Sequence, residues 1–353
     1  MIDLPEPPAP DGSVLARTLL IGMCGTDREI AADGYGVPPP GEERLVLGHE
    51  SLAEVIEAPE GSGFAPGDLI AGVVRRPDPL PCPACAADEW DMCQTGDFVE
   101  LGIKERHGYG SERFRLDPRF AVRLEPGLGD LGVLLEPTSV LAKALEHAER
   151  IGARAWFDPR VALITGAGPI GLLAALLARQ RGLDTHVVDL VTEGAKPRLV
   201  ADLGAHYHST PVAELPLEPD IVIECTGVGE VVIDATHLAA PGAVVALTGI
   251  SHSERAGEAY LDALNKDLVL GNKVVFGTVN AARRHYDQAA DALAAADPGW
   301  LARLITRRLP RENWPAGLEK GPEDIKVVVD MTASTSEHES RVASAGRPEG
   351  KPT

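Results

Sequence analysis

The pattern of hydrophobic and polar positions changes character near residue 145. Before that point, short apolar runs alternate with turn segments such as Ala65–Asp68. Such runs predict short β-strands, which we place at residues 14–21, 45–47, 52–56 and 68–74. Many short strands at close spacing indicate an irregular, mostly antiparallel β domain. From Ser139 to Ile151 the apolar residues recur at helical spacing, which predicts a helix.

Beyond Arg160 the pattern alternates between buried strands and helices. We expect strands at 161–165, 186–189, 220–225, 243–247 and 274–276, and helices at 170–181, 196–203 and 284–295. Alternation of this kind predicts an α/β fold with a doubly wound parallel sheet. A last strand is expected at 325–329. Residues 332–353 are small and polar, so we predict a disordered tail.

Charge excludes two classes of partner. The 353 residues include 53 acidic and 33 basic side chains, which gives a net charge of −20. Such a chain repels phosphates, so we expect neither nucleic acid nor an anionic membrane as a partner. Met1–Pro5 does not begin a secretory signal, and glycines and Pro169 divide the uncharged stretch 161–178 into a strand and a helix. We therefore predict a cytoplasmic protein with reduced thiols.

A glycine-rich loop follows the strand at 161–165 and opens a helix. Its sequence matches G-x-G-x-x-G, a pattern that in this context is typical of dinucleotide binding. Glycines there let the backbone approach a pyrophosphate at the helix N-terminus. The alternative is a tight turn in an unrelated α/β sheet. The predicted cofactor-binding residues are Gly166, Gly168, Pro169, Ile170, Gly171, Asp189 and Thr226.

The choice of nicotinamide cofactor depends on three charged residues. Asp189 ends the second strand of the unit, where a carboxylate can bind the ribose hydroxyls. Because it would repel a 2′-phosphate, we expect NAD. Lys196 and Arg198 lie just beyond and could bind that phosphate, which leaves NADP open. The alternative for these two cations is a solvated helix start.

Two groups of residues suit metal ions. Cys24 and the pair His49–Glu50 follow β segments, and Glu136 lies within an apolar stretch. A thiolate, an imidazole and a carboxylate together suit Zn²⁺, although each residue alone has an ordinary structural interpretation.

The second group is Cys82, Cys85 and Cys93, whose spacing indicates a structural zinc. A fourth ligand is missing from that pattern, and Asp78 is the nearest oxygen upstream. The alternatives are a redox pair or a loop that has lost its metal. The fifth cysteine, Cys225, is expected to pack in the core.

These motifs, in this order, resemble the zinc-dependent medium-chain alcohol dehydrogenases over residues 2–329. The resemblance implies a GroES-like catalytic domain, at 1–145 and 276–331, and a Rossmann domain at 146–275. It also implies a catalytic zinc held by Cys24, His49 and Glu50, with Glu136 as a further ligand or water-mediated contact. The family's structural zinc loop has four cysteines, and Pro79 stands where the first should be.

Several segments are similar to the glucose dehydrogenase branch of that family. They are Cys24–Asp27, Gly48–Ser51, Glu100–Ile103, His107–Tyr109 and Gly277–Ala281. The similarity implies oxidation of an aldose such as D-glucose at C1, with Thr26, Glu100, Glu136 and Asn280 facing the sugar. Thr26, or a water held by a carboxylate such as Glu50, would then take the proton. The alternatives are purely structural roles, a surface salt bridge for Glu100 and a turn-forming role for Asn280.

The chain departs from the branch in two further places. Ser139 and Val140 occupy a region where the branch often has an aspartate, so another polyol or a secondary alcohol is the alternative substrate. The family usually has a strand before the segment at Ile2, which here implies a late start codon or a lost edge strand. A non-catalytic nucleotide-binding protein is the remote alternative, and family analogy implies a homodimer or homotetramer.

Overall fold

A computed structural model describes residues 13–251 and 261–333 of the chain. Contacts divide the chain into two compact units. The first consists of Met1–Arg76, Asp97–Leu134 and Ile305–Thr353, and the second of Pro77–Gly96 and Leu135–Leu304. These units differ from the expected domain boundaries at residues 77–96, 135–145 and 276–304. At 135–145 and 276–304 the difference arises because helices α3 (Leu135–Gly152) and α8 (Arg283–Ala294) pack against each other within the second unit. At 77–96 it reflects the contact of Asp91 with Lys143 of α3.

The first unit contains a sheet that has seven strands among the described residues. Six of them follow the order β15-β16-β1-β2-β3-β8, and β7 also pairs with β1. Inward-facing residues of β1 and its neighbours form the core, in which Val14, Ala16, Ala53 and Ile70 are buried. The bounds are β1 Val14–Met23, β2 Glu50–Glu57, β3 Leu69–Gly72, β7 Arg113–Leu116, β8 Ala121–Arg123, β15 Ile305–Pro310 and β16 Lys326–Asp330.

Shorter elements complete this unit. A small sheet joins β4 (Arg75–Arg76), β5 (Val99–Leu101) and β6 (Glu105–Arg106), and helix α1 spans Gly25–Asp33. The expected strands at 14–21, 52–56, 68–74 and 325–329 are confirmed, with shifts of a few residues at their ends.

The expected strand at residues 45–47 is wrong. Val46 and Leu47 instead accept single hydrogen bonds from the backbone N–H groups of Gly108 and Gly110, at 2.7 and 3.0 Å. The two segments approach so closely that a Cβ at either glycine would lie 2.5 Å from the Leu47 oxygen. The close approach therefore needs glycine at positions 108 and 110. It gives an irregular contact between two loops in place of regular strand pairing at residues 45–47.

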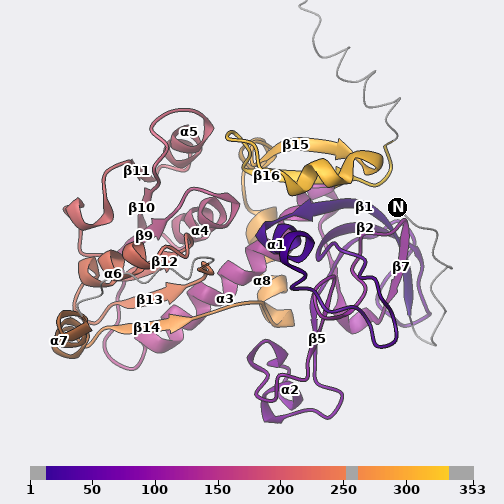
Figure 1. The fold of residues 1–353 in the computed structure, drawn as a ribbon, viewed down its shortest axis with the longest axis horizontal. Coiled ribbons are helices and arrows are strands. Elements are labelled where there is room, and N and C mark those ends of the chain that lie inside the picture. Colours follow the sequence, from indigo (N-terminus) through magenta and orange to yellow (C-terminus); the bar gives the residue numbers. More distant parts are fainter. Residues whose placement is uncertain (1–12, 252–260, 334–353) are drawn as a thin grey trace, which may run out of the picture. The chain divides into compact units, whose positions relative to one another are not determined.

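The second unit is built on a parallel sheet with strand order β11-β10-β9-β12-β13-β14 (Figure 1). The order reverses direction between β9 and β12, and dinucleotides bind at such a reversal in doubly wound sheets. The predicted α/β class with two different sheets is therefore confirmed. The strands are β9 Val161–Thr165, β10 Asp184–Val188, β11 His206–His208, β12 Ile221–Glu224, β13 Val244–Leu247 and β14 Val274–Gly277.

Helices cover this parallel sheet. Helix α4 is apolar almost throughout, and all its residues from Gly171 to Ala178 are buried, as expected for a helix in the core. The other helices are α2 Pro83–Ala86, α5 Ala195–Asp202, α6 Gly229–Leu238, α7 Leu261–Gly271 and α9 Pro298–Ala302, and α4 spans Pro169–Gln180. Short 3₁₀ helices lie at Trp90–Met92, Pro118–Phe120, Pro126–Leu134, Val212–Glu214 and Arg311–Leu318.

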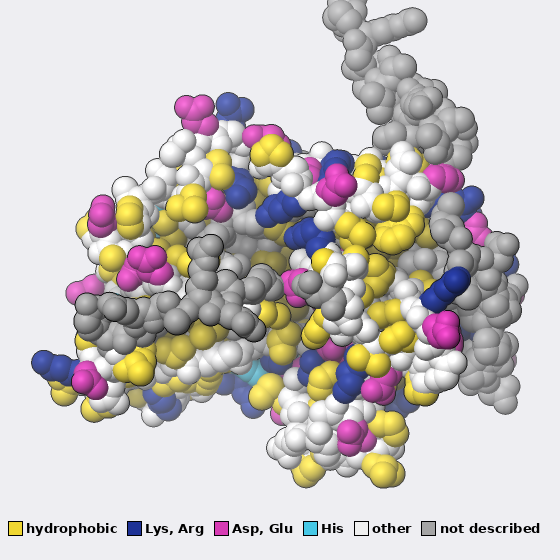
Figure 2. Space-filling view, viewed as in Figure 1, with side chains coloured by type: hydrophobic (Ala, Val, Ile, Leu, Met, Phe, Trp, Pro, Cys, Tyr) yellow, Lys and Arg dark blue, Asp and Glu magenta, His cyan; other side chains and the backbone are white. Residues whose placement is uncertain are grey.

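Two predictions about the chain ends concern mostly residues outside the described ranges, namely the tail at 332–353 and the strand before Ile2. Within the described ranges, no helix combines the length and the apolar character that crossing a membrane requires. Acidic side chains are spread over the visible face of both units (Figure 2).

Candidate metal and nucleotide sites

The first unit brings Cys24, His49 and Glu50 together. One ligand atom from each of the three lies within 4.8 Å of the others. The Cys24 Sγ and His49 Nε2 atoms are 3.1 Å apart. Cys24 precedes helix α1, and His49 and Glu50 stand where β2 begins. The predicted zinc-binding residues of this unit therefore converge from two segments that are 25 residues apart in sequence.

Asp27 is a part of this cluster that the sequence analysis did not assign a role. Its carboxylate is fully buried, lies 3.4 Å from His49 Nδ1 and accepts the backbone N–H of Cys24 at 2.9 Å. One side chain thus orients both predicted ligands. The signal was present in the Cys24-x-x-Asp27 spacing, which puts the carboxylate in the first turn of α1, opposite the cysteine backbone.

Charge in this cluster is arranged for a cation. Burial opposes a charged imidazole at His49, but Cys24 and Asp27 outweigh it and raise the pKa of His49 well above its usual value. Burial likewise acts to raise the pKa of Asp27, but His49 outweighs it and the pKa is lowered.

The backbone before His49 requires a glycine. Gly48 has a φ of +94°, in the left-handed region, and a Cβ there would lie 2.9 Å from the Gly110 nitrogen. The predicted Gly48-His49-Glu50 motif therefore has a conformational reason for its first residue as well as a chemical reason for the other two.

Glu50 has a second contact, a buried ion pair with Lys326 of β16. Both side chains are almost fully buried, and breaking one half of such a pair costs about 3–5 kcal/mol because the other charge stays uncompensated. The pair anchors the carboxylate beside Cys24 and His49.

The cysteine loop belongs to the second unit. One sulfur each from Cys82, Cys85 and Cys93 lies within 4.8 Å of the others. Asp78 is not a member of this cluster. Its carboxylate accepts the backbone N–H of Leu80 at 2.8 Å and the Thr95 hydroxyl at 2.6 Å. A backbone N–H from Gln94 lowers the pKa of Cys82 to about 7, and burial raises that of Cys85 to about 11.

An ion pair that the sequence analysis missed anchors this loop. Asp91 lies 2.8 Å from Lys143 of α3, and both side chains are nearly inaccessible to solvent. Lys143 also donates to the Val279 carbonyl at 3.0 Å. One lysine thus joins the cysteine loop, helix α3 and the segment that leads to Asn280.

The glycine-rich loop has the conformation that nucleotide binding requires. Gly166 adopts a φ of +87°, and a Cβ at Gly171 would lie only 1.7 Å from the Gly166 carbonyl oxygen. Gly168 precedes the first turn of α4, in which Pro169 and Ile170 are the first residues. The helix N-terminus therefore stands open beside a tight turn, an arrangement suited to a pyrophosphate.

Asp189 lies across from this loop, immediately after β10. Its carboxylate accepts N–H groups from Ala167 at 2.6 Å and Val191 at 3.1 Å and lies 3.1 Å from the Lys196 ammonium. Burial acts to raise the pKa of Asp189, but these partners outweigh it and lower the pKa. Lys196 is thus bound to Asp189, and Arg198 is exposed.

Thr226 lies beside the same loop. Its methyl group would be 3.1 Å from a Cβ at Gly166, and its N–H donates to the Glu224 carboxylate at 2.7 Å. Glu224 is fully buried at the end of β12 and also accepts from the Thr165 hydroxyl and the Gly227 N–H. This carboxylate organises the loops around the reversal point, and no sequence pattern that we used identified it.

The predicted sugar-facing residues lie in different units. In the first unit, Thr26 is half-buried in the first turn of α1. Glu100 is buried on β5 and forms an ion pair with Arg75 at 2.9 Å, so the salt bridge that we considered is present but is not at the surface.

In the second unit, Glu136 is in the first turn of α3. Asn280 has a φ of +61° and accepts the Ala281 N–H at 2.7 Å, features of a turn-forming residue. The Ser139 hydroxyl donates to the Glu136 carbonyl at 2.6 Å. Sugar contacts of all four residues stay predictions.

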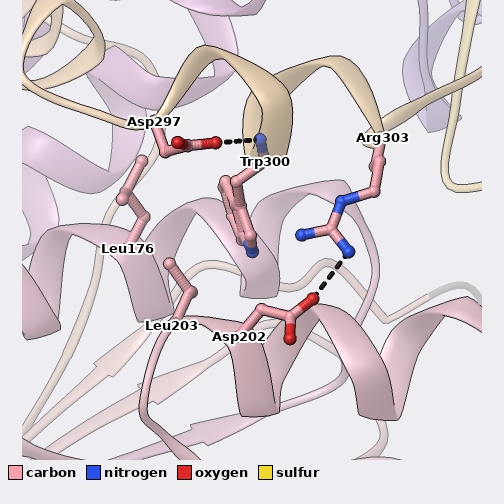
Figure 3. Close-up of a pocket in the computed structure, with 6 residues that line it drawn as sticks. All are labelled: Leu176, Asp202, Leu203, Asp297, Trp300 and Arg303. Carbon is pink, nitrogen blue, oxygen red and sulfur yellow. Dashed lines mark hydrogen bonds and ion pairs between the residues drawn. The ribbon is translucent and has the colours of Figure 1, made fainter.

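A small pocket of about 250 Å³ lies elsewhere in the second unit (Figure 3). Its lining includes the ion pair between Asp202 and Arg303, at 2.6 Å, and the buried Trp300, whose backbone N–H donates to the Asp297 carboxylate. It contains none of the predicted site residues.

A Cys–His–Glu cluster in an irregular β unit, combined with a glycine loop on a parallel sheet, is typical of zinc-dependent dehydrogenases that bind a dinucleotide. Residues 10–126 match the family described as the alcohol dehydrogenase GroES-like domain. Residues 129–331 match the family described as the glucose dehydrogenase C-terminus.

Curated relatives and solved structures point to the same family as these two matches. The chain is 39% identical over 343 residues to a glucose 1-dehydrogenase of Methanocella arvoryzae, covering 94% of this chain and 95% of the relative. It is 38% identical over 337 residues to that of Thermoproteus tenax, covering 93% and 94%. A Haloferax mediterranei glucose dehydrogenase in complex with NADP, Zn and gluconolactone is 31% identical, with a TM-score of 0.87 and coverage of 94% and 96%. The chain belongs to the glucose dehydrogenase branch of the zinc-dependent medium-chain alcohol dehydrogenases.

Proposed function

We propose that this protein is an NAD(P)-dependent dehydrogenase that oxidises an aldose such as D-glucose at C1. The sugar and the oxidised dinucleotide become the lactone, the reduced dinucleotide and one proton. The observation that carries this proposal is the convergence of Cys24, His49 and Glu50 within 4.8 Å, in a chain related over nearly its full length to glucose 1-dehydrogenases.

The donor set of this cluster fits zinc. Sulfur, imidazole nitrogen and carboxylate oxygen are its usual ligands, and Asp27 supports His49 from the far ring nitrogen as carboxylates do at zinc sites. Cys24, His49 and Glu50 would hold the ion, with Glu136 as a further ligand or water-mediated contact. When bound, zinc acts as a Lewis acid that lowers the pKa of a sugar hydroxyl.

The other residues bind and orient the sugar. Glu100, Glu136 and Asn280 supply fixed hydrogen-bonding groups, which a polyol needs if C1 is to be held in one orientation. The Thr26 hydroxyl accepts the proton of the C1 hydroxyl and passes it to water, with the Glu50 carboxylate as the alternative acceptor. The Arg75 ion pair supports this role of Glu100, because it fixes the carboxylate on β5.

For the dinucleotide, we propose that the loop Gly166–Gly171 binds the pyrophosphate, with Thr226 beside it and Asp189 at the ribose. The ion pair with Lys196 compensates the negative charge of Asp189. When NAD is bound, the Asp189 carboxylate accepts hydrogen bonds from the ribose hydroxyls. With NADP, Lys196 and the exposed Arg198 turn to the 2′-phosphate, so both cofactors are used.

We also propose a second, structural zinc at Cys82, Cys85 and Cys93, with a ligand other than Asp78 in the fourth position.

Free thiols at all five cysteines support a reducing, cytoplasmic location. A homodimer or homotetramer is supported by β14, which pairs on one side only among the described residues and leaves a sheet edge for a second copy.

A second substrate class is favoured by one observation. Ser139 is buried and its hydroxyl is bonded within α3, so it offers no replacement for the aspartate that the branch often has there. Another polyol or a secondary alcohol is therefore the alternative substrate.

The test is a panel of aldoses, polyols and secondary alcohols assayed with NAD and with NADP by absorbance of the reduced nicotinamide. The proposal predicts that D-glucose or another aldose has the highest kcat/KM and that a lactone is the product. A polyol or secondary alcohol as the best substrate would favour the alternative. Absence of turnover with every substrate in zinc-loaded protein would contradict both.

A further inference from the structure

Four side chains with metal-binding groups share one face at the edge of the parallel sheet. Asp184 and His186 are two residues apart on β10, and His206 and His208 are two residues apart on β11. Alternate residues of a strand point to the same face. His186 pairs with His206 in the parallel register, so the two histidines stand side by side on neighbouring strands.

The distances among three of these residues are those of a ligand cluster. His186 Nε2 lies 3.5 Å from one Asp184 oxygen, and His206 Nε2 lies 3.3 Å from the other. One ligand atom from each of Asp184, His186 and His206 lies within 4.8 Å of the other two. A carboxylate thus stands between two imidazoles, each with its Nε2 atom turned to it.

His208 orients the His186 ring by a contact on the side of the ring away from Asp184. Its Nε2 atom is 2.8 Å from His186 Nδ1, and the planes of the two rings are within 15° of each other. A hydrogen bond at Nδ1 fixes the ring and leaves Nε2 available, which is the usual support of a metal-binding histidine.

Accessibility also suits an ion that enters from solvent. Asp184 and His206 are exposed, whereas His186 is only 8% exposed and is therefore held in place. Two imidazoles and one carboxylate are ligands of zinc and of similar divalent transition metals, and water completes the coordination. Magnesium and calcium prefer all-oxygen sites, so they fit these residues poorly.

We propose that Asp184, His186 and His206 bind one Zn²⁺ ion at the surface of the second unit, with His208 as a positioning residue. This site is separate from Cys24, His49 and Glu50 and from the cysteine loop, and it does not depend on the proposed function. It joins β10 to the edge strand β11 through side chains, in addition to the backbone hydrogen bonds between them.

The site has a structural consequence for the nucleotide side of the sheet. The Asp189 N–H donates to the His208 carbonyl at 3.1 Å, and the Tyr207 hydroxyl donates to the Val191 carbonyl. Strand β11 therefore supports the loop that carries Asp189. An ion that binds the folded chain here stabilises it by an amount that rises with the logarithm of the free-ion concentration once the concentration exceeds Kd.

The experiment measures zinc bound per chain after equilibrium dialysis of the full-length protein against micromolar zinc. Wild type is compared with His206→Gln and Asp184→Asn, whose exposed side chains leave the core untouched. His237→Gln is the matched control, since His237 is another exposed histidine of this unit, and its Nδ1 atom lies 3.3 Å from the Asp267 carboxylate. We expect His206→Gln and Asp184→Asn to bind one zinc fewer than wild type and His237→Gln to bind the same number.

A second measurement is the melting temperature with and without added zinc. Zinc is expected to raise the melting temperature of wild type and of His237→Gln by more than that of His206→Gln, which keeps only the gain from the other two clusters. Aldose oxidation is expected to be unchanged in His206→Gln. Equal zinc content and equal zinc-induced shifts in wild type and His206→Gln would overturn the proposal. Because both proteins retain the other two clusters, failure here is distinguishable from failure of the dehydrogenase assignment.

Discussion

The two clusters predicted from sequence to bind zinc differ in what surrounds them. Cys24, His49 and Glu50 have mixed donors, and buried groups of opposite charge, Asp27 and Lys326, support them. The cysteine loop has sulfur donors alone, and an ion pair between Asp91 and Lys143 anchors it.

The difference indicates that the first cluster serves the reaction and the second serves the fold. Mixed ligands with an oriented histidine suit a site that must exchange a water for substrate, whereas a closed all-sulfur site contributes to folding. In the loop, the replacement of the first cysteine by Pro79 leaves three sulfurs, and the Asp91–Lys143 pair supplies an anchor that needs no metal. Substitutions at the two clusters separate these two roles.

Replacing His49 with Ala is expected to have the largest effect. Without the imidazole the site loses a metal ligand, and transition-state stabilisation of several kcal/mol corresponds to a fall in kcat/KM of about 10³-fold or more. Dinucleotide affinity, measured by fluorescence titration, should stay within about twofold, because the glycine loop belongs to the other unit. His237→Ala serves as the control. An equal loss of cofactor affinity would contradict the assignment.

Lys143→Met tests the anchor of the cysteine loop. The substitution leaves Asp91 buried without its cation, which is expected to lower the free energy of unfolding by about 3–5 kcal/mol in denaturant titrations. Arg119→Met is the control, because Arg119 pairs with Asp117 at the surface and such pairs contribute about 1 kcal/mol or less. A loss of stability no larger than that of the control would show that the pair is not an anchor.

Asp27→Asn sharpens the role of the carboxylate behind His49. Removing such an orienting group typically costs about 10–100-fold in metal affinity or activity. We expect zinc affinity in competition with a chelator to fall by that factor. Glu29→Gln, on the same helix, should leave it unchanged. Unchanged affinity in Asp27→Asn would mean that Asp27 only caps α1.

Lys196→Ala tests the choice of cofactor. Loss of a charge-assisted contact of about 1.5–3 kcal/mol should lower kcat/KM for NADP by about 10–100-fold, with a smaller change for NAD. Arg160→Ala, a surface residue paired with Asp158, is the control. Equal changes for both cofactors would place Lys196 away from the 2′-phosphate.

Cys93→Ser is expected to have the smallest effect on catalysis. The variant should lose any metal held by the loop, seen as one zinc fewer per chain, with kcat/KM within about twofold of wild type because the Asp91–Lys143 pair still anchors the segment. A collapse of activity comparable to that of His49→Ala would place this loop in the reaction.

Much of the fold could be predicted because its signals are local. Periodicity located β9, α4 and β12 to within two residues, and the glycine loop specified the reversal point of the sheet. The strand expected at 45–47 failed because its conformation depends on the close approach of Gly108 and Gly110, which lie far away in sequence.

The same distinction applies to the candidate sites. Cys24 and His49 could be predicted from their motifs, since metal-binding residue types at characteristic spacings can be recognised in the sequence alone. The Asp91–Lys143 pair and the histidines of β10 and β11 could not, because only helix packing or strand register brings the partners together. The role of Glu224 could not either, because strand register places its partner Thr165, 59 residues away in sequence, beside it. Asp27 stands between these cases, close in sequence to Cys24 but recognisable only by its distance to His49.

The most direct measurement is the rate of dinucleotide reduction by D-glucose in zinc-loaded protein, in protein stripped by a chelator, and in stripped protein to which zinc is returned. Oxidation of glucose to the lactone that is lost with zinc and restored by it is the expected result for wild type, with no restoration in His49→Ala. Glucose oxidation at an undiminished rate in zinc-free protein would contradict the zinc-dependent mechanism. Absence of turnover with aldoses in fully loaded protein would contradict the substrate.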